Sequence, residues 1–303
     1  MACSSATTVI LLGSCGLTAL NGPVPEPTPR REPAASSAAP LPSAPVTPTP
    51  RPAASPASPK KTSSVVGERS PEANPPRLPD ASRNALAFAP LDDPGEVTVE
   101  GRFVSASAWS TSKVLVVAAF LDTAADGDLE AVSAANRRLI AAALTKSDAD
   151  AVSAISRQIP GRPGLAMTSV LRSIGDEVTV APDSYQGLMR WSVREQVRFM
   201  AALANGKVVS KAASAYLLAT MHPIKAHAWG LGTVGATAYK GGWLRSDTAT
   251  RQMGILDGYA VVIMTDGVGP AVRQTDGDSA HVQQMNQLAE LLSQRLARRR
   301  SDR

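Results

Sequence analysis

The distribution of aromatic residues and prolines divides this chain into two unlike parts. None of the twelve Phe, Trp and Tyr residues precedes residue 81, whereas 17 of the 24 prolines lie between residues 21 and 80. A segment rich in Pro, Ala, Ser and Thr without hydrophobic periodicity cannot bury much apolar surface and is typical of an extended tether. We therefore expect residues 21–80 to be a linker and residues 81–303 to form one folded domain.

The first twenty residues have the features of an export leader. An apolar run over residues 9–15 has the length of a signal-peptide core and is too short to span a bilayer. Its end, Leu12-Gly13-Ser14-Cys15, resembles the bacterial lipobox, in which the cysteine is lipidated. We expect residues 1–20 to direct export to the cell envelope, as a lipoprotein anchored through Cys15 or as a secreted protein. No Lys or Arg precedes Cys15, so a start site placed too late, a weak export signal and a soluble leader remain alternatives.

Cysteine and histidine positions argue against metal chemistry in the domain. Both cysteines, Cys3 and Cys15, lie in the leader, so the domain has neither a disulfide nor a cysteine-based metal site. The three histidines, His222, His227 and His281, lack the spacing of metal ligands. No Gly-rich nucleotide loop, HExxH or CxxC motif occurs. The sequence therefore predicts no metal and no cofactor.

The formal net charge of +5 is spread along the chain except for a basic cluster at its C-terminus. Cations at the end of an amphipathic helix interact favourably with the helix dipole and with water, whereas a nucleic-acid interface would interleave them with aromatic residues. We interpret the cluster as a solvated helix end and expect no nucleic-acid partner. Its members are Arg295, Arg298, Arg299, Arg300 and Arg303.

Hydrophobic patterning in the domain predicts strands at both ends and helices between them. The apolar run 114–121 indicates a central buried helix that begins near Ser110. Asp257-Gly258 indicates a type I′ hairpin between two C-terminal strands. This order predicts an α+β fold whose antiparallel sheet joins the N- and C-terminal segments. The expected strands are 85–90, 97–104, 236–243, 251–256 and 259–265, and the expected helices are 110–121, 129–144, 149–158, 192–204, 211–221 and 280–299.

Ser110-Thr111-Ser112-Lys113 is an S-x-x-K motif at the start of this central helix. The i, i+3 spacing brings the lysine amine to the same helix face as the serine hydroxyl. A desolvated lysine with a lowered pKa can accept the serine proton and so generate a nucleophile. The alternative is that Ser110 caps the helix while the amine of Lys113 extends to the surface.

Two further motifs follow in order, and together the three resemble the active-site set of the penicillin-interacting serine enzymes. Ser147-Asp148 lies between two predicted helices, and Lys240-Gly241-Gly242 lies in a predicted strand. In that family the corresponding motifs are S-x-x-K, S-D-N and K-T-G. Further segments are similar to class A β-lactamases and to an exported, lipoprotein-like group related to them: 109–115 to the active-site helix, 174–179 to the lead into the Ω-loop, and 241–243 and 251–256 to the closing strands.

This resemblance implies a β-lactamase/transpeptidase-like fold and a role for each matched residue. Ser110 would be the acylated nucleophile, Lys113 its general base, and Ser147 the relay of a proton to the leaving nitrogen. Lys240 would hold positive potential that favours a substrate carboxylate, and Gly242 and Trp243 would border the oxyanion hole formed by the N–H groups of Ser110 and Trp243. A β-lactam or a peptide resembling those of peptidoglycan would be the substrate.

The departures from the family pattern affect the binding of the substrate and the hydrolysis of the acyl-enzyme. Ala149 replaces the Asn of S-D-N, and Gly241 replaces the hydroxyl residue of K-T-G. The segment between residues 180 and 191 is short and lacks the Ω-loop glutamate, with Asp183 as its only acid. About 37 residues separate Ser110 from Ser147, which implies a reduced helical subdomain. We therefore expect a poor β-lactamase, and a non-catalytic envelope protein that binds wall peptides or a protein partner remains the alternative.

Two aromatic residues near the motifs each admit a simple structural role. Trp191 precedes Ser192, which with Glu195 forms the pattern of a capping box, so a hydrophobic staple competes with a substrate platform. Tyr239 neighbours Lys240 in a strand and should face the opposite side of the sheet, in the core.

Overall fold

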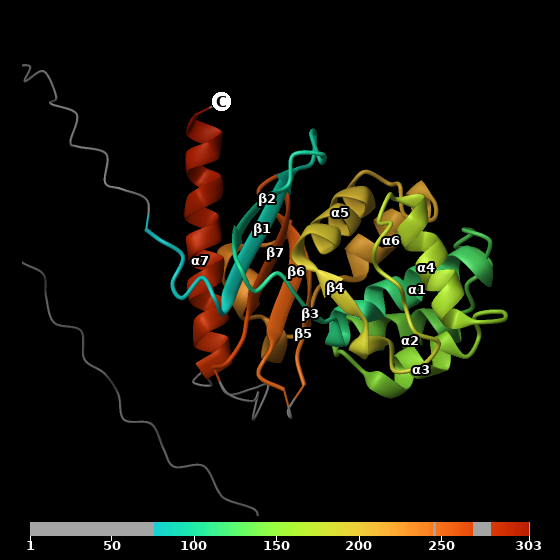
Figure 1. Cartoon of the computed structure of the whole chain (residues 1–303). Coiled ribbons are helices and arrows are strands. Elements are labelled where there is room, and N and C mark those ends of the chain that lie inside the picture. Colours follow the sequence, from blue (N-terminus) through green and yellow to red (C-terminus); the bar gives the residue numbers. More distant parts are fainter. Residues whose placement is uncertain (1–75, 245–246, 269–279, 303) are drawn as a thin grey trace, which may run out of the picture. The chain divides into compact units, whose positions relative to one another are not determined.

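The computed structural model describes residues 76–244, 247–268 and 280–302, all within one compact unit that spans Arg69–Arg303. The leader and Cys15 lie outside the described residues. In the described part, a five-stranded antiparallel sheet has one long helix on one face and a group of helices on the other (Figure 1). This is the expected α+β architecture.

The sheet brings together the two ends of the domain in the order β2-β1-β7-β6-β5. The tight β6–β7 hairpin turns at Asp257 and Gly258, whose φ angles of 53° and 81° fit the predicted type I′ turn. β1 pairs with β7 from Asn84↔Thr265 to Pro90↔Tyr259, which closes the N-terminal strand onto the C-terminal hairpin. The strands are β1 (Asn84–Pro90), β2 (Thr98–Gly101), β5 (Ala238–Gly242), β6 (Thr250–Leu256) and β7 (Tyr259–Thr265).

Two apolar cores lie on the two faces of the sheet, because strand side chains alternate between faces. One core joins the sheet to the helical group, and the other joins it to α7 (Ala280–Ser301). Tyr239 belongs to the second core, as predicted, and is only 6% exposed. Arginines of α7 bind the edge strand β2 and the β6–β7 turn: Arg295 donates to Glu100 at 2.8 Å, and Arg300 pairs with Asp257 at 2.9 Å.

The helical group surrounds α1 (Ser112–Thr123), whose residues 114–121 are all buried. This confirms the central helix that the continuous apolar run predicts. The other helices are α2 (Ala134–Thr145), α3 (Ala149–Ser156), α4 (Pro163–Ser173), α5 (Val193–Ala204) and α6 (Lys211–Thr220).

Three local features differ from the sequence prediction. α4 was not predicted; it begins with Pro163 at its first turn, where the missing N–H of proline costs nothing. The three-residue strands β3 (Ser105–Ser107) and β4 (Arg190–Ser192) form a separate two-stranded sheet. The capping box is only half made: Ser192 Oγ accepts from the Glu195 N–H at 3.1 Å, but the Glu195 carboxylate binds Arg198.

Candidate active site

Ser110 lies in a single 3₁₀ turn, Trp109–Thr111, that leads directly into α1. Lys113 Nζ donates to Ser110 Oγ at 2.9 Å. The turn is held by Thr111 Oγ1, which donates to Ala108 O at 2.6 Å, and by Ser112 Oγ, which donates to the carbonyl of Trp109 at 2.7 Å. Ser110 makes no capping hydrogen bond, so the geometry departs from the capping alternative and matches the pairing expected for S-x-x-K.

The amine of Lys113 is in an unusual environment for a lysine. Burial lowers its pKa to about 8, and the negative charge of Asp148 opposes this shift only in part. Asp148 itself is the N-cap of α3 and accepts from the Ala151 N–H at 2.9 Å. A large fraction of Lys113 is therefore unprotonated in mildly alkaline solution, where the free amine can accept a proton at the distance observed.

Ser147 occupies the junction between α2 and α3 in a left-handed backbone conformation, with φ of 60°. Its hydroxyl accepts a hydrogen bond of 2.7 Å from Lys240 Nζ, which comes from strand β5 of the sheet. A non-glycine residue at positive φ is strained, and the strain is retained here where the hydroxyl meets a distant strand.

Lys240 is placed differently from what the family resemblance implies. Its side chain is buried, and Nζ donates both to Ser147 Oγ and to the Gly241 carbonyl, at 2.7 and 3.0 Å. Burial, and secondly the charge of Lys113, place the pKa of Lys240 well below its ordinary value. Lys240 is absent from the residues that line the cleft. Its buried amine is bound to Ser147 and to the Gly241 carbonyl and is not among the groups that line the cleft.

Strand β5 passes very close to the turn that carries Ser110. A Cβ on Gly242 would lie 2.6 Å from Ala108 O and 3.1 Å from the Ser110 nitrogen, so only glycine fits there. Trp243 follows, with its ring packed against Trp229 and His227 at centroid distances of 5.0 and 5.1 Å. The backbone at the end of β5 thus lies beside the Ser110 N–H, the arrangement that two oxyanion donors require.

A second contact joins the turn of Ser110 to the segment between β5 and β6. Trp109, which has φ of 45°, donates through Nε1 to Asp247 Oδ2 at 2.8 Å. Asp247 Oδ1 accepts from the Thr248 and Ala249 N–H groups, so the carboxylate is held by its own loop. The S-x-x-K turn is therefore attached to the segment between β5 and β6 as well as to β5.

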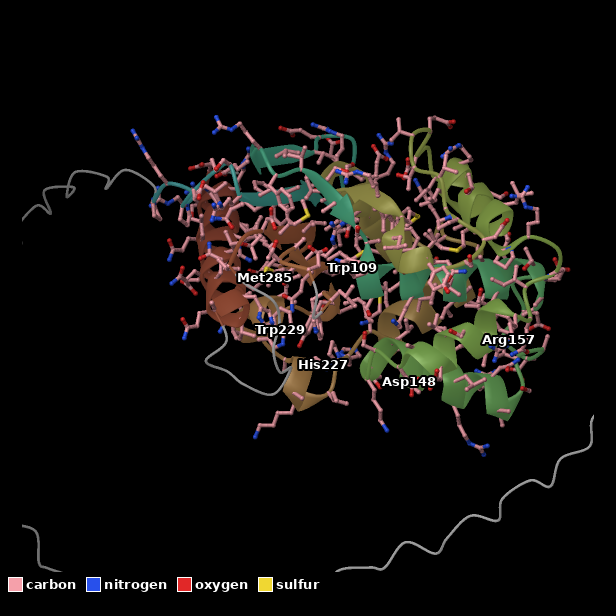
Figure 2. All side chains as sticks on the ribbon, turned by 60° about the horizontal axis from the view of Figure 1, so that its bottom comes forward. Trp109, Asp148, Arg157, His227, Trp229 and Met285 are labelled. Carbon is pink, nitrogen blue, oxygen red and sulfur yellow. The ribbon has the colours of Figure 1, made fainter. Side chains whose placement is uncertain are left out.

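Ser110, Lys113, Ser147 and Trp243 line one cleft of about 590 Å³. Its wall is completed by one face of α3 and by the segment 183–187. Figure 2 shows Trp109 near the middle of the molecule and Arg157 farther out on the helical side, with Asp148 between them in this view. No sequence motif marks Arg157 or Gln186 as part of this lining. The remaining lining residues are Trp109, Ser112, Val116, Ala149, Val152, Ser153, Ser156, Arg157, Asp183, Ser184, Tyr185, Gln186, Gly187 and Leu244.

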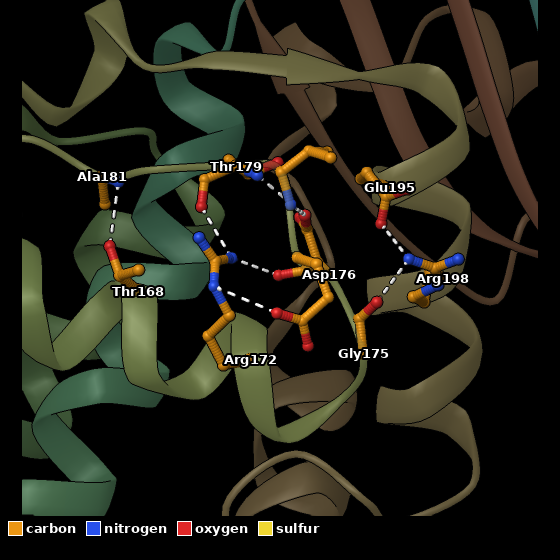
Figure 3. A network of polar contacts seen from close by, with 10 residues as sticks. Thr168, Arg172, Gly175, Asp176, Thr179, Ala181, Glu195 and Arg198 are labelled. Atoms are coloured by element: carbon orange, nitrogen blue, oxygen red, sulfur yellow. Dashed lines mark hydrogen bonds and ion pairs between the residues drawn. The ribbon is translucent and has the colours of Figure 1, made fainter.

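The segment before this lining is held by a polar network (Figure 3). Asp176 is buried, and its Oδ1 accepts from the Val178 and Thr179 N–H groups at 3.1 and 2.9 Å. Arg172 donates to the Asp176 and Thr179 carbonyls. The Ala181 N–H donates to Thr168 Oγ1 at 3.0 Å, which attaches the segment to α4. The segment that resembles the lead into the Ω-loop therefore fixes one wall of the cleft.

Asp183, the only acid of the segment between residues 180 and 191, is already engaged. Its carboxylate accepts from Arg162 Nε at 2.9 Å and from the Gly164 N–H at 3.1 Å. The hydrogen bond from Arg162 contributes most to lowering its pKa. A carboxylate held in this way is a weak base. Trp191 is fully buried against Phe199, with ring centroids 5.3 Å apart, which supports a packing role over a substrate platform.

Among the described residues, no cluster of three or more His, Cys, Asp or Glu side chains could hold a metal ion. In the same part of the chain, no helix combines the length and apolar character needed to cross a membrane.

The sequence matches no protein-family profile and no curated protein. Solved structures do share its fold. The extended-spectrum β-lactamase TLA-1 matches with a TM-score of 0.56 at 13% identity, covering 72% of this chain and 94% of that one. A β-lactamase from Chitinophaga pinensis gives 0.56 at 15% identity, with coverages of 72% and 95%. PBP-A gives 0.55 at 20% identity, with coverages of 73% and 92%. The chain therefore has a β-lactamase/transpeptidase-like fold, as the resemblance predicted.

Proposed function

We propose that this protein is a serine acyl-transfer enzyme of the β-lactamase and penicillin-binding type, acylated on Ser110 and slow to release the acyl group. The observation that carries the proposal is the 2.9 Å contact between Lys113 Nζ and Ser110 Oγ in an open cleft, made by a lysine whose pKa is about 8. If Ser110 only capped the helix and Lys113 only extended to the surface, the two side chains would not need to be in contact and the lysine would not need to be buried.

The proposed acylation follows from the positions of three side chains. The free amine of Lys113 takes the Ser110 hydroxyl proton while Oγ bonds to the substrate carbonyl carbon, and negative charge moves to the carbonyl oxygen. The N–H groups of Ser110 and Trp243 would stabilise that oxyanion. When the tetrahedral intermediate collapses, the bond to the leaving nitrogen breaks and Ser147 relays to that nitrogen the proton that Lys113 took, leaving an ester on Ser110 and Lys113 again as a free amine.

Hydrolysis of that ester has less support than its formation. Release requires a water molecule activated by a base, and the one carboxylate of the described cleft lining, Asp183, is held by Arg162 and Gly164. Gln186, in the wall segment that passes the Ser110 turn, carries an amide and no carboxylate. A variant of PBP-A, a protein of the same fold, has been captured as an acyl-enzyme with penicillin G. We therefore propose a long-lived acyl-enzyme and poor β-lactamase activity.

A fluorescent penicillin tests this proposal directly. The wild-type chain should become covalently labelled, with the mass increase of one intact penicillin located on Ser110, and Ser110→Ala should not be labelled. Ser301→Ala, at an exposed serine of α7 outside the cleft lining, is a matched control that should still react. Rapid and complete turnover of a chromogenic cephalosporin would contradict the proposed slow release. Absence of any adduct over hours would contradict the acylation.

A binding protein without catalysis is the second candidate, and two observations favour it. Lys240 does not present its charge to the cleft, and Ala149 and Gly241 lack side chains that could hold a substrate. Two other observations favour the enzyme. The Ser110 and Lys113 side chains are in contact, and the cleft beside them is open. Mass spectrometry of the penicillin reaction separates the two candidates.

We propose that the enzyme acts at the cell envelope on a β-lactam or a peptide resembling those of peptidoglycan, held there by a lipid on Cys15. The apolar run and the lipobox-like sequence before Cys15 support this localisation. Expression in a bacterial host with a radiolabelled fatty acid should label the wild-type chain in the membrane fraction and should not label Cys15→Ser. Equal labelling of both chains, or a wholly cytoplasmic wild type, would contradict it.

A further inference from the structure

The cleft extends well beyond the residues that the acylation needs. The residues of α3 and its C-cap that line it, Ala149, Val152, Ser153, Ser156 and Arg157, follow the spacing of one helix face along the whole length of α3. From residue 149 to residue 157 an α-helix rises about 12 Å, at about 1.5 Å per residue. The cleft therefore leads from Ser147 to a second region about two helical turns away.

Arg157 is the cation of this outer region. It caps the C-terminus of α3 through its backbone, while its exposed guanidinium has no hydrogen bond or ion pair among the described residues. Gln186 Nε2 donates to Ser156 Oγ at 3.2 Å, which leaves the proton of that buried hydroxyl available. A guanidinium and a hydroxyl on adjacent positions of a cleft wall are donors suited to a carboxylate.

Asp183 also lines the cleft, and its negative charge could compete with a substrate carboxylate for Arg157. It forms an ion pair with Arg162 at 2.9 Å and accepts from the Gly164 N–H, so a cation already balances its negative charge. No ion pair joins Asp183 to Arg157 among the described residues. The guanidinium of Arg157 therefore remains available to an incoming anion, and Lys240 is unavailable because its amine is buried against Ser147.

We propose that Arg157 and Ser156 form an anion-binding subsite for a carboxylate of the substrate, at the end of the cleft opposite Ser147. An extended peptide advances about 3.3–3.6 Å per residue, so the carboxylate would lie about three to four residues from the bond that Ser110 attacks. This inference rests on the proposed function, because it assumes that the cleft holds an acyl donor. It names the substrate class as an acidic peptide.

Binding to the Ser110→Ala chain tests the subsite without requiring catalysis. The probes are dansylated, C-terminally amidated alanine heptapeptides that carry one glutamate, placed near either end because the direction of the bound peptide is open, and their glutamine counterparts. At least one glutamate peptide should bind about three- to tenfold more tightly than its glutamine counterpart, as expected for a partly exposed charge-assisted hydrogen bond. The preference should weaken with added salt.

Variants at two arginines decide the assignment. Arg157→Gln in the Ser110→Ala background should abolish the preference for glutamate, whereas Arg138→Gln, an exposed arginine on α2 outside the cleft lining, should retain it. Equal binding of glutamate and glutamine peptides, or an unchanged preference in Arg157→Gln, would overturn the subsite. If the wild type is acylated by fluorescent penicillin but shows no preference, only the subsite fails. If the preference is present but no adduct forms, the acyl-transfer proposal fails.

Discussion

The amine of Lys240 donates a hydrogen bond of 2.7 Å to the hydroxyl of Ser147, across 93 residues of sequence. The contact joins the sheet to the helical group at the cleft, and it couples a buried lysine to the side chain proposed to transfer a proton. Because the pKa of Lys240 lies well below its ordinary value, owing first to burial and then to the charge of Lys113, its amine can exchange protons with Ser147. Ser147 and Lys240 should therefore act as one unit.

A double-mutant cycle on this pair should be strongly non-additive. Ser147→Ala should slow acylation about a hundredfold, the lower range for loss of a general acid or base. Lys240→Met should slow it to a similar degree, and the double variant no further, because either change breaks the same relay. The Met side chain should leave the thermal midpoint equal to or above that of the wild type, since it removes a buried polar group without leaving a cavity. Lys207→Met, an exposed lysine, is the control. Additive losses in labelling rate would show that the two side chains act separately.

The acylation rate should rise with pH through a midpoint near 8. The pKa of Lys113 is lowered to about 8 mainly by burial, and only the unprotonated amine can accept the Ser110 proton. Below the midpoint the amine is protonated and the rate should fall about tenfold per pH unit; above it the rate should level off. Labelling by fluorescent penicillin between pH 6 and pH 9.5 measures this profile. A rate independent of pH over that range would exclude Lys113 as the base.

Gly242 should be the least replaceable residue of β5. An alanine Cβ would lie 2.6 Å from Ala108 O and 3.0 Å from the Thr111 nitrogen, so the strand must move away from the Ser110 turn. Overpacking of this kind costs about 1–3 kcal/mol of unfolding free energy. The displacement would also move the Trp243 N–H away from the oxyanion, so acylation should fall by more than the thermal midpoint suggests. Gly95→Ala, whose Cβ would meet only Asp93 Oδ1 at 3.7 Å, should be nearly neutral. Wild-type labelling by Gly242→Ala would refute the proposed oxyanion donors.

The sequence predicted those parts of the fold that a few neighbouring residues determine. The apolar run 114–121, the Asp257-Gly258 turn and the Ser110–Lys113 spacing each specify their structure within a few residues, and each appears as predicted. The pairing of β3 with β4 could not be predicted, because strands of three residues carry no period and form only when residues 105 and 192 are already adjacent.

The positions of the charged side chains around the cleft could not be predicted from the sequence either. Whether Lys240 faces the substrate or supports Ser147 depends on how deeply β5 is buried beneath the helical group, which no motif encodes. Arg157 enters the cleft only because the lining face of α3 ends there, opposite the segment 183–187. Its neighbours in sequence give no sign of that position. The burial of Lys113, in contrast, could be anticipated from the apolar helix that follows it.

Gln186→Glu should convert slow release of the acyl group into measurable turnover. The backbone of this wall segment passes the Ser110 turn, since a Cβ on Gly187 would lie 3.3 Å from the Trp109 Cα, while the Gln186 amide donates to Ser156 Oγ and to the Asp183 carbonyl. A glutamate has no N–H to donate to these two acceptors, so its carboxylate is free to turn toward the ester. A carboxylate there could accept a proton from a water molecule that attacks the ester, a role that an amide cannot fill. General-base assistance of this kind contributes about 10²–10⁴-fold, and an unoptimised position should provide at least about tenfold. The lifetime of the penicillin adduct, followed by mass spectrometry, should shorten accordingly, whereas Gln186→Met should leave it long. If both variants release the adduct at the wild-type rate, the missing carboxylate is not what limits deacylation, and access of water to the ester must be limiting instead.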